Sequence, residues 1–163
     1  KADRDIMFGY FDVVSFNEYP CWYPVKFKHS LGCLHKIWDV WRTRMQWVKE
    51  HFPEKPLIIS EAGGGGIYGR HGGWKEKWAE EFQALLVMMH AYTADRNDRM
   101  SGIAVWHFAD NPVDPHGKDE SKRPGGLNNK GVLSLDRTPK LAYTYLESLW
   151  NGSQRRGPHL IPA

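Results

Sequence analysis

The sequence predicts an α/β fold organised around a parallel sheet, and three observations carry that prediction. Short apolar stretches alternate with longer stretches whose apolar residues recur every three or four positions, the pattern of strands followed by helices. One short stretch, residues 57–59, is apolar throughout, as in strands that a parallel sheet buries. The chain of 163 residues, 41% hydrophobic and 25% charged, has the size of one globular domain. It is too short for a complete eight-stranded β/α barrel, which takes roughly 200 residues or more.

The sequence of the first part of the chain predicts two strands with a helix between them. Residues 12–19 begin with β-branched and apolar residues and end in polar ones, which indicates a strand. A helix follows from Ser30, a suitable N-cap, and ends before Pro53. Residues 56–61 form the next strand, which we expect to be buried on both faces, and the four glycines at 63–66 must form a loop. The predicted helix carries one apolar stripe, formed by Leu31, Leu34, Trp38, Trp41, Met45 and Val48.

The second part of the chain predicts two more helices and one more strand. Residues 101–108 form the strand, residues 111–126 a polar loop, and the last helix begins at Pro139. We expect residues 1–150 to form one domain and residues 151–163 an irregular tail. The helix that precedes the strand is predicted from the spacing of Trp74, Trp78, Phe82, Leu85, Leu86 and Met89.

Composition and charge argue against several classes of function. The net charge of +3 is spread along the chain, with no basic run of the kind that binds nucleic acid. The longest apolar stretch, residues 84–89, is far shorter than the ~18 residues of a membrane-spanning helix. Cys21 and Cys33 form no CxxC motif, so a zinc ribbon or a disulfide scaffold is not expected. His29 and His35 lack the spacing of a helix-borne metal site, and we expect no metal ion and no cofactor.

Polar side chains gather where the predicted strands end, which in a parallel sheet is one common edge. Glu61 follows the apolar stretch of the second strand, so its carboxylate should emerge at that edge. Tyr19 and Trp106 come from the neighbouring strand ends, where a phenol could orient the carboxylate and an indole could form an apolar floor for a sugar ring. The alternatives are a Glu that only ends a strand and a Trp that only fills the core.

Several segments, taken together and in order, resemble glycoside hydrolase family 2, and the β-glucuronidases within it most of all. The resemblance implies that the chain contains strands six to eight of a (β/α)8 TIM barrel with their helices. Residues 1–150 would be the C-terminal part of that barrel. The segments that carry the resemblance are residues 12–23, 56–63, 105–110, 128–131 and 137–140.

The resemblance implies that Glu61 is the nucleophile of a retaining, exo-acting β-glycosidase. Such a carboxylate attacks the anomeric carbon and forms a glycosyl-enzyme that water releases. A second carboxyl protonates the leaving oxygen, and in the family this acid/base comes from strand four, upstream of Lys1. Glu18 matches no catalytic position of the family and should point away from Tyr19. We expect Glu18 to have a structural role.

Other residues match family positions around the sugar. Tyr19 would donate a hydrogen bond that keeps the nucleophile ionised, and Asn17 would line the site. Tyr23 matches a pocket position, although a packed loop aromatic explains it equally well. Trp106 would lie under the sugar, and His107, where these enzymes commonly carry Asn, could contact a sugar hydroxyl.

Asn128 and Lys130 form an Asn-x-Lys motif that in the β-glucuronidases contacts the C6 carboxylate of the sugar. An ammonium and an amide donor suit a carboxylate better than a hydroxymethyl group. By itself the segment 128–131 would be an ordinary turn. Departures at Ala62, at His107 and in residues 111–124 leave the sugar open. We therefore expect β-glucuronides, with a β-galacturonidase, a β-galactosidase or a non-catalytic carbohydrate-binding remnant as alternatives.

The resemblance also predicts partners within the same protein. The rest of the barrel and N-terminal β-sandwich domains would complete the chain, and the full-length parent would form a homo-oligomer. The chain begins at Lys1 without a Met or a secretory signal, so we expect a processed chain or part of a longer one. Bacterial cytoplasm, periplasm and a lysosome-like compartment remain equally open.

Overall fold

The computed structural model describes residues 6–23, 31–116 and 123–155. Within them, three strands form a parallel sheet in the order β1-β2-β3. These strands are β1 (Val14–Asn17), β2 (Leu57–Ala62) and β3 (Met100–Val105). The prediction of strands alternating with helices around a parallel sheet is confirmed.

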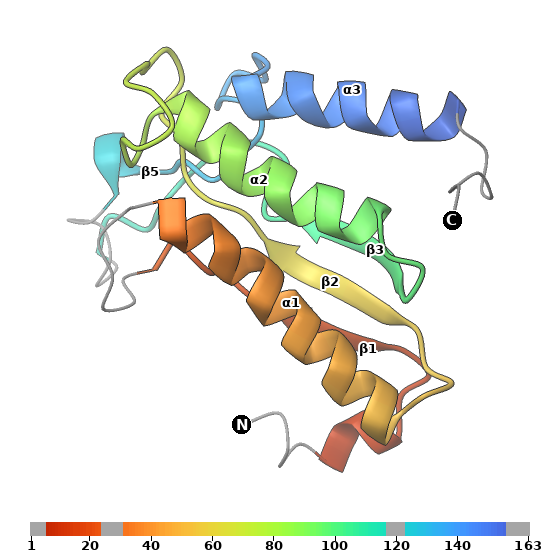
Figure 1. The fold of residues 1–163 in the computed structure, drawn as a ribbon. Coiled ribbons are helices and arrows are strands. Elements are labelled where there is room, and N and C mark those ends of the chain that lie inside the picture. The colour runs from red at the N-terminus through yellow and green to blue at the C-terminus, as the bar shows by residue number, and fades with distance from the viewer. Residues whose placement is uncertain (1–5, 24–30, 117–122, 156–163) are drawn as a thin grey trace.

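Three α-helices accompany the sheet. The first two are α1 (Leu31–His51), which follows β1, and α2 (Glu80–Asp95), which follows β2. Both lie on the same face of the sheet, and α3 (Leu141–Arg155) packs beside α2 (Figure 1). A single core joins α1 to the strands. Trp41 and Val48 of the predicted apolar stripe are buried in it, but Trp38 is 41% exposed, so the prediction is wrong for that residue, and Ile37 is buried instead. Members of that core are Val14, Phe16, Ile37, Trp41, Val48, Leu57 and Ile59.

Among the described residues, helices cover only one face of the sheet. Val14 and Phe16 of β1 are buried, whereas Ser15 and Asn17 are exposed, as alternation along a strand requires. Ile58 of β2 is only partly buried between two buried neighbours. The prediction that residues 56–61 are buried on both faces is therefore wrong for this part of the protein.

The second helix begins later than its apolar spacing indicates. Trp74 and Trp78 lie before α2, because the chain at Trp78 has a left-handed φ of 77° that no continuous helix allows. The indole of Trp78 instead packs edge-on against Trp22, with ring centroids 4.9 Å apart. The apolar spacing came from a loop that packs on the same core, so the predicted start was wrong.

Short elements occupy the remaining described segments. The 3-10 helix η2 (Ile6–Gly9) precedes β1. The strands β4 (Asn111–Pro112) and β5 (Leu127–Asn128) pair antiparallel, and η4 (Pro124–Gly126) precedes β5. The prediction of a loop over residues 111–126 is thus wrong at both ends.

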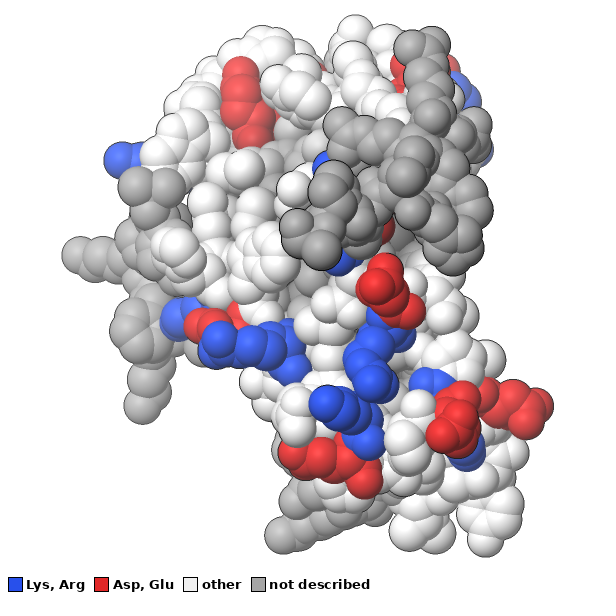
Figure 2. Space-filling view, turned by 45° about the vertical axis from the view of Figure 1, so that its right-hand side comes forward, with Lys and Arg blue, Asp and Glu red and all other residues white. Residues whose placement is uncertain are grey.

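The last helix extends further than the sequence predicts. Residues 151–155 belong to α3, so the irregular tail expected from residue 151 is wrong for these residues, and residues 156–163 lie outside the described part. The expected N-cap Ser30 lies outside it as well. Among the described helices, none combines the length and the apolar character needed to cross a membrane. Figure 2 shows a face on which Lys and Arg side chains are intermingled with Asp and Glu side chains.

A buried histidine joins α1 to α2. The indole Nε1 of Trp41 donates a hydrogen bond of 2.8 Å to Nδ1 of His90, and neither side chain is exposed. Burial lowers the pKa of His90 from 6.5 to about 3, because the charged ring would lose its hydration. The neutral ring therefore accepts this bond at Nδ1, and its proton lies on Nε2.

We expect the stability of α2 to fall as the pH is lowered from 6.5 towards 3. In that window an unfolded chain protonates His90 and the folded chain does not, which costs up to about 1.4 kcal/mol per pH unit. Hydrogen exchange of the α2 amides, corrected for its intrinsic pH dependence, should lose about tenfold in protection per unit. His90→Gln keeps an acceptor for Trp41 and should lack this loss. An equal loss of protection in the parent and in His90→Gln would contradict the assignment of this pH dependence to His90.

Candidate active site

Glu61 lies near the carboxyl end of β2, beside the end of β1. Its backbone carbonyl accepts a hydrogen bond of 3.0 Å from the amide of Glu18, and Asn17 is its partner in register. The hydroxyl of Tyr19 donates to Oε2 of Glu61 at 2.8 Å. The structure therefore brings together the carboxylate and the phenol that the sequence places at one edge of the sheet.

Tyr19 remains a hydrogen-bond donor at every physiological pH. Burial raises its pKa far above the usual value, and the hydrogen bond and negative charge of Glu61 raise it further. A phenol that keeps its proton stabilises the ionised form of the carboxylate that accepts it. This contact fixes the position of the Glu61 carboxylate at the rim of the sheet.

Lys130 lies against the ring of Tyr19 and is only 3% exposed. Its ammonium is 4.4 Å from the centroid of Tyr19 and 4.8 Å from that of Tyr23. It donates a hydrogen bond of 2.8 Å to the hydroxyl of Tyr23. None of the described carboxylates lies within 4.0 Å of this ammonium. A buried cation without a carboxylate partner is costly, and an anionic ligand would offset that cost.

Asn128 and Asn17 both engage their side-chain amides. Oδ1 of Asn128 accepts a hydrogen bond of 3.2 Å from Nη1 of Arg123, which directs the amide towards a cation. Oδ1 of Asn17 accepts a hydrogen bond of 2.6 Å from the hydroxyl of Ser60, the residue before Glu61. Asn17 lies on the uncovered face of β1.

Trp106 and His107 follow β3. The amide of Trp106 donates to the carbonyl of Ala62 at 2.9 Å, and its side chain is 41% exposed, so the indole is not a core residue among the described ones. A Cβ on Gly63 would lie 2.7 Å from the carbonyl oxygen of Trp106, which explains the glycine after Ala62. His107 donates its amide to the carbonyl of Lys130 at 3.0 Å, and burial lowers the pKa of its ring.

Glu18, which directly follows β1, points away from Tyr19, as the sequence predicts. It forms an ion pair with Arg44 of α1, whose Nε donates to Oε1 at 2.7 Å. Tyr19, the next residue, contacts Glu61 instead, so the two side chains point to different parts of the protein although both follow β1. This ion pair ties the end of β1 to α1.

A buried ion pair that sequence reasoning missed supports the Asn-x-Lys segment. Nζ of Lys140 donates to Asp110 at 2.8 Å and to the carbonyls of Gly66 at 2.6 Å and Asn129 at 3.3 Å. Oδ1 of Asp110 also accepts the amide of Gly131 at 2.9 Å. Burial raises the pKa of Asp110 and lowers that of Lys140, and the ion pair opposes both shifts. Both residues lie in segments of the family resemblance, but no sequence pattern shows that they pair.

Two side chains of α2 complete this support. Nε2 of Gln83 donates to the carbonyls of Gly64 at 3.1 Å and Gly131 at 2.9 Å. The carboxylate of Glu80 accepts the amides of Gly69 at 2.6 Å and Leu141 at 2.7 Å. The first turn of α2 therefore fixes the loop after Glu61 relative to residues 128–131.

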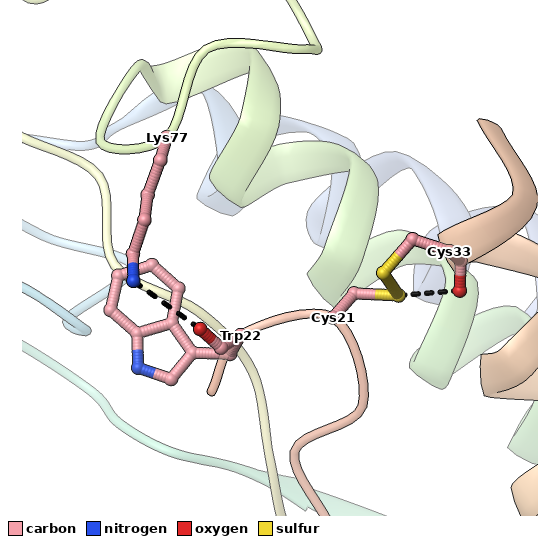
Figure 3. The surroundings of a disulfide bond; sticks show 4 residues. All are labelled: Cys21, Trp22, Cys33 and Lys77. Atoms are coloured by element: carbon pink, nitrogen blue, oxygen red, sulfur yellow. Dashed lines mark hydrogen bonds between the residues drawn. A yellow bond between two sulfur atoms is a disulfide. The ribbon is translucent and has the colours of Figure 1, made fainter. Parts of the chain in front are cut away.

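A disulfide joins the loop after β1 to the start of α1, which corrects the expectation from cysteine spacing. Cys21 and Cys33 are bonded, with Cα atoms 5.5 Å apart (Figure 3). Twelve residues of sequence separate them, and only the return of the chain to α1 brings them together. Trp22 follows Cys21 directly and is buried beneath Lys77 (Figure 3). Within the described residues, no group of three or more His, Cys, Asp or Glu side chains could hold a metal ion.

No family model matches the chain. Mouse β-glucuronidase is 30% identical over 163 residues, covering 98% of this chain and 23% of that protein. Human β-glucuronidase is 31% identical over 157 residues, covering 93% of this chain and 22% of that protein. The chain thus spans about a quarter of the length of the curated relatives it matches.

Solved structures give the same result. A GH2 β-galacturonidase from Eisenbergiella tayi bound to galacturonate superimposes with a TM-score of 0.76 at 31% identity, covering 91% of this chain and 25% of that one. A Bifidobacterium dentium β-glucuronidase complexed with coumarin-3-O-glucuronide gives 0.77 at 29% identity, covering 93% and 22%. The resemblance of the chain to β-glucuronidase-like glycoside hydrolases is therefore confirmed, over a segment about a quarter as long as those enzymes.

Proposed function

We propose that this chain carries the nucleophile and the carboxylate-binding residues of a retaining, exo-acting β-glycosidase that hydrolyses β-glucuronides. The observation that carries the proposal is the arrangement around Tyr19. Its hydroxyl holds the carboxylate of Glu61 at 2.8 Å, and the buried ammonium of Lys130 lies 4.4 Å from its ring. A nucleophilic anion and a cation without a described carboxylate partner thus flank one side chain, as a site for an anionic sugar requires.

The proposed reaction assigns a separate task to each group. The carboxylate of Glu61 attacks the anomeric carbon as the glycosidic bond breaks, and water then releases the sugar from the glycosyl-enzyme. Tyr19 orients the carboxylate of Glu61 by donating a hydrogen bond to its Oε2. The acid that protonates the leaving oxygen lies about 5–5.5 Å from the nucleophile in retaining enzymes. We assign it to a part of the protein outside this chain, since Glu18 is engaged by Arg44.

Substrate selection in this proposal depends on Lys130 and Asn128. A sugar carboxylate would pair with the ammonium of Lys130, whereas a neutral sugar would leave that buried charge unpaired. Asn17, Tyr23, Trp106 and His107 would contact the sugar or hold these groups in place. β-Galacturonides are a second candidate, because the 31% identical Eisenbergiella tayi structure is that of a β-galacturonidase with galacturonate bound.

The architecture that we propose is the last part of a (β/α)8 barrel, with β1, β2 and β3 as its sixth to eighth strands. Three features support it: the parallel strand order, the helices on one face, and the uncovered opposite face with Ser15 and Asn17. The described strands β1 and β3 each pair on one side only, which leaves an edge for further strands. The remaining barrel, N-terminal β-sandwich domains and a homo-oligomeric assembly complete the proposal.

A panel of four p-nitrophenyl β-glycosides tests this function on the full-length protein. The glucuronide and the galacturonide measure the two candidate uronide activities, and the glucoside and the galactoside measure neutral-sugar activity. We expect kcat/KM to be highest for the glucuronide. Turnover of the neutral sugars alone, or no turnover at all, would contradict the proposal.

Replacing Tyr19 by Phe should lower kcat for every substrate in the panel by about 10- to 100-fold, because a hydrogen bond to a charged group is worth about 1.5–3 kcal/mol. The loss should appear in kcat more than in KM, since the hydroxyl contacts Glu61 and the ring remains. Tyr10→Phe is the matched control, because Tyr10 is 80% exposed. An unchanged kcat in Tyr19→Phe would remove Tyr19 from the mechanism.

A further inference from the structure

A second lysine, Lys77, lies against Trp22, an indole that the ammonium of Lys130 also approaches. Lys77 lies between the glycine loop and α2, and its ammonium is 4.4 Å from the centroid of Trp22 and 5.7 Å from that of Trp78. It also donates to the carbonyl of Trp22 at 3.3 Å (Figure 3). The ammonium of Lys130 is 5.9 Å from the centroid of the same Trp22 indole. Two ammonium groups from distant parts of the chain therefore converge on one ring.

A third cationic side chain, Arg123, adds to the positive charge of Lys77 and Lys130. Arg123 binds Asn128, the first residue of the Asn-x-Lys motif, and its charge acts on Lys77 together with that of Lys130. None of the described carboxylates lies within 4.0 Å of Lys77 or Lys130. Like charges in a partly buried site repel one another, so packing alone does not explain why these three cations lie near one another. An anion bound between these groups would reverse the sign of that interaction.

We propose that Lys77 is a specificity-determining residue, whose ammonium attracts the same substrate carboxylate that Lys130 binds. This inference rests on the proposed function and extends it: the ligand is a sugar acid whose charge is stabilised by two ammonium groups rather than one. The competing explanation is that Lys77 only covers the indole of Trp22. The two explanations differ in one respect, because covering an indole does not depend on the charge of the substrate.

The chain offers a matched control two residues away. Lys75 is exposed, and its ammonium stacks on Trp74 at 4.7 Å from the ring centroid, so it is also a lysine over an indole in the same loop. It has no described contact with Lys130 or Asn128. Replacing Lys75 by Met removes a lysine–indole contact without changing the proposed anion site.

The experiment compares kcat/KM for the glucuronide and the glucoside in the full-length protein and its variants. Lys77→Met should lower the value for the glucuronide by about 5- to 30-fold, mainly through KM, and leave the glucoside within about twofold. Lys77→Arg should restore most of the loss, and Lys75→Met should match the parent for both sugars. Equal losses on both sugars in Lys77→Met, or no loss on either, would overturn the proposal.

The pH profile gives an independent readout. Burial, together with the charges of Lys130 and Arg123, lowers the pKa of Lys77, while the nearby Tyr23 opposes this shift. Lys77 therefore loses its charge at a lower pH than an ordinary lysine. The KM for the glucuronide should rise as the pH increases through that range, and the KM for the glucoside should not. In Lys77→Met this rise should be absent or shifted to higher pH, and an unchanged rise would count against Lys77.

Equilibrium binding separates failure of this inference from failure of the proposed function. Calorimetric titration of the full-length Glu61→Gln variant with free glucuronate measures the anion site without catalysis. If the glycoside panel shows no turnover but glucuronate binds and Lys77→Met weakens binding, the proposed function fails and the inference stands. If the glucuronide is hydrolysed but Lys77→Met leaves the affinity for glucuronate unchanged, the inference fails and the proposed function stands. Absence of glucuronate binding overturns it as well, and Lys77→Gln serves where the Met variant does not fold.

Discussion

Glu61→Gln is expected to abolish turnover of every glycoside, with a loss in kcat on the order of 10⁴- to 10⁶-fold, the range found when an enzyme's nucleophile is removed. The amide keeps the shape of the side chain and can still accept the hydrogen bond that Tyr19 donates to Glu61. It cannot form a glycosyl ester, so the first step of the proposed reaction is lost. Binding of the sugar should change little, because recognition depends on Lys130 and Asn128.

Glu18→Gln is the matched control for this prediction. Glu18 is a carboxylate at the end of the neighbouring strand, bound by Arg44 and turned away from Tyr19. Its loss should affect stability and leave kcat within a few-fold. A small nucleophile such as azide should restore cleavage in Glu61→Ala and give the opposite anomeric configuration. Comparable losses in both Gln variants, or near-normal turnover in Glu61→Gln, would exclude Glu61 as the nucleophile.

Most of the sheet could be predicted from the sequence, because its strands are local patterns. The apolar run before Glu61 and the β-branched start of β1 each identify a strand without knowledge of the rest. The carboxyl ends of parallel strands share one edge, so the proximity of Tyr19 and Glu61 also follows from the fold class. Their hydrogen bond of 2.8 Å spans 42 residues of sequence but only one strand pairing.

The contacts that escaped prediction depend on loops. Lys130 and Tyr23 are 107 residues apart, and the backbone of residues 63–79 decides how Lys77 reaches Trp22. The spacing of Trp74 and Trp78 wrongly predicted the start of the second helix, because loop residues that pack on a core can show a helical periodicity by chance. The disulfide between Cys21 and Cys33 also depends on a loop, because it forms where the irregular segment after β1 returns to α1.

The buried pair of Asp110 and Lys140 shows why the candidate site was only partly predictable. Sequence identifies both residues as parts of motifs, but their function is to hold backbone carbonyls and amides of other segments. A pattern of side chains cannot show which main-chain groups need a partner. The geometry of the Asn-x-Lys segment therefore depends on residues that no motif singles out for substrate binding.

Replacing Lys130 by Ala should shift specificity rather than abolish the reaction. In the parent, the buried ammonium pairs with the carboxylate of the sugar, and losing one partner of a buried charged pair costs about 2–5 kcal/mol. The kcat/KM for the glucuronide should therefore fall by roughly 30- to several-thousand-fold. The glucoside has no carboxylate to lose a partner, so its kcat/KM should fall by a much smaller factor. Glu61→Gln differs because it removes turnover of both.

Stability must be separated from recognition in the Lys130→Ala variant, because Lys130 also donates to Tyr23 and stacks on Tyr19. Lys130→Met keeps much of the buried aliphatic volume and should show the same shift in specificity. Lys49→Ala, an exposed lysine near the end of α1, is the control and should behave as the parent. The ratio of kcat/KM values for glucuronide and glucoside is the measurement, since a variant that is partly unfolded loses both equally. An unchanged ratio in Lys130→Ala would mean that residues 128–131 form only a turn, and that the sugar carboxylate is bound elsewhere.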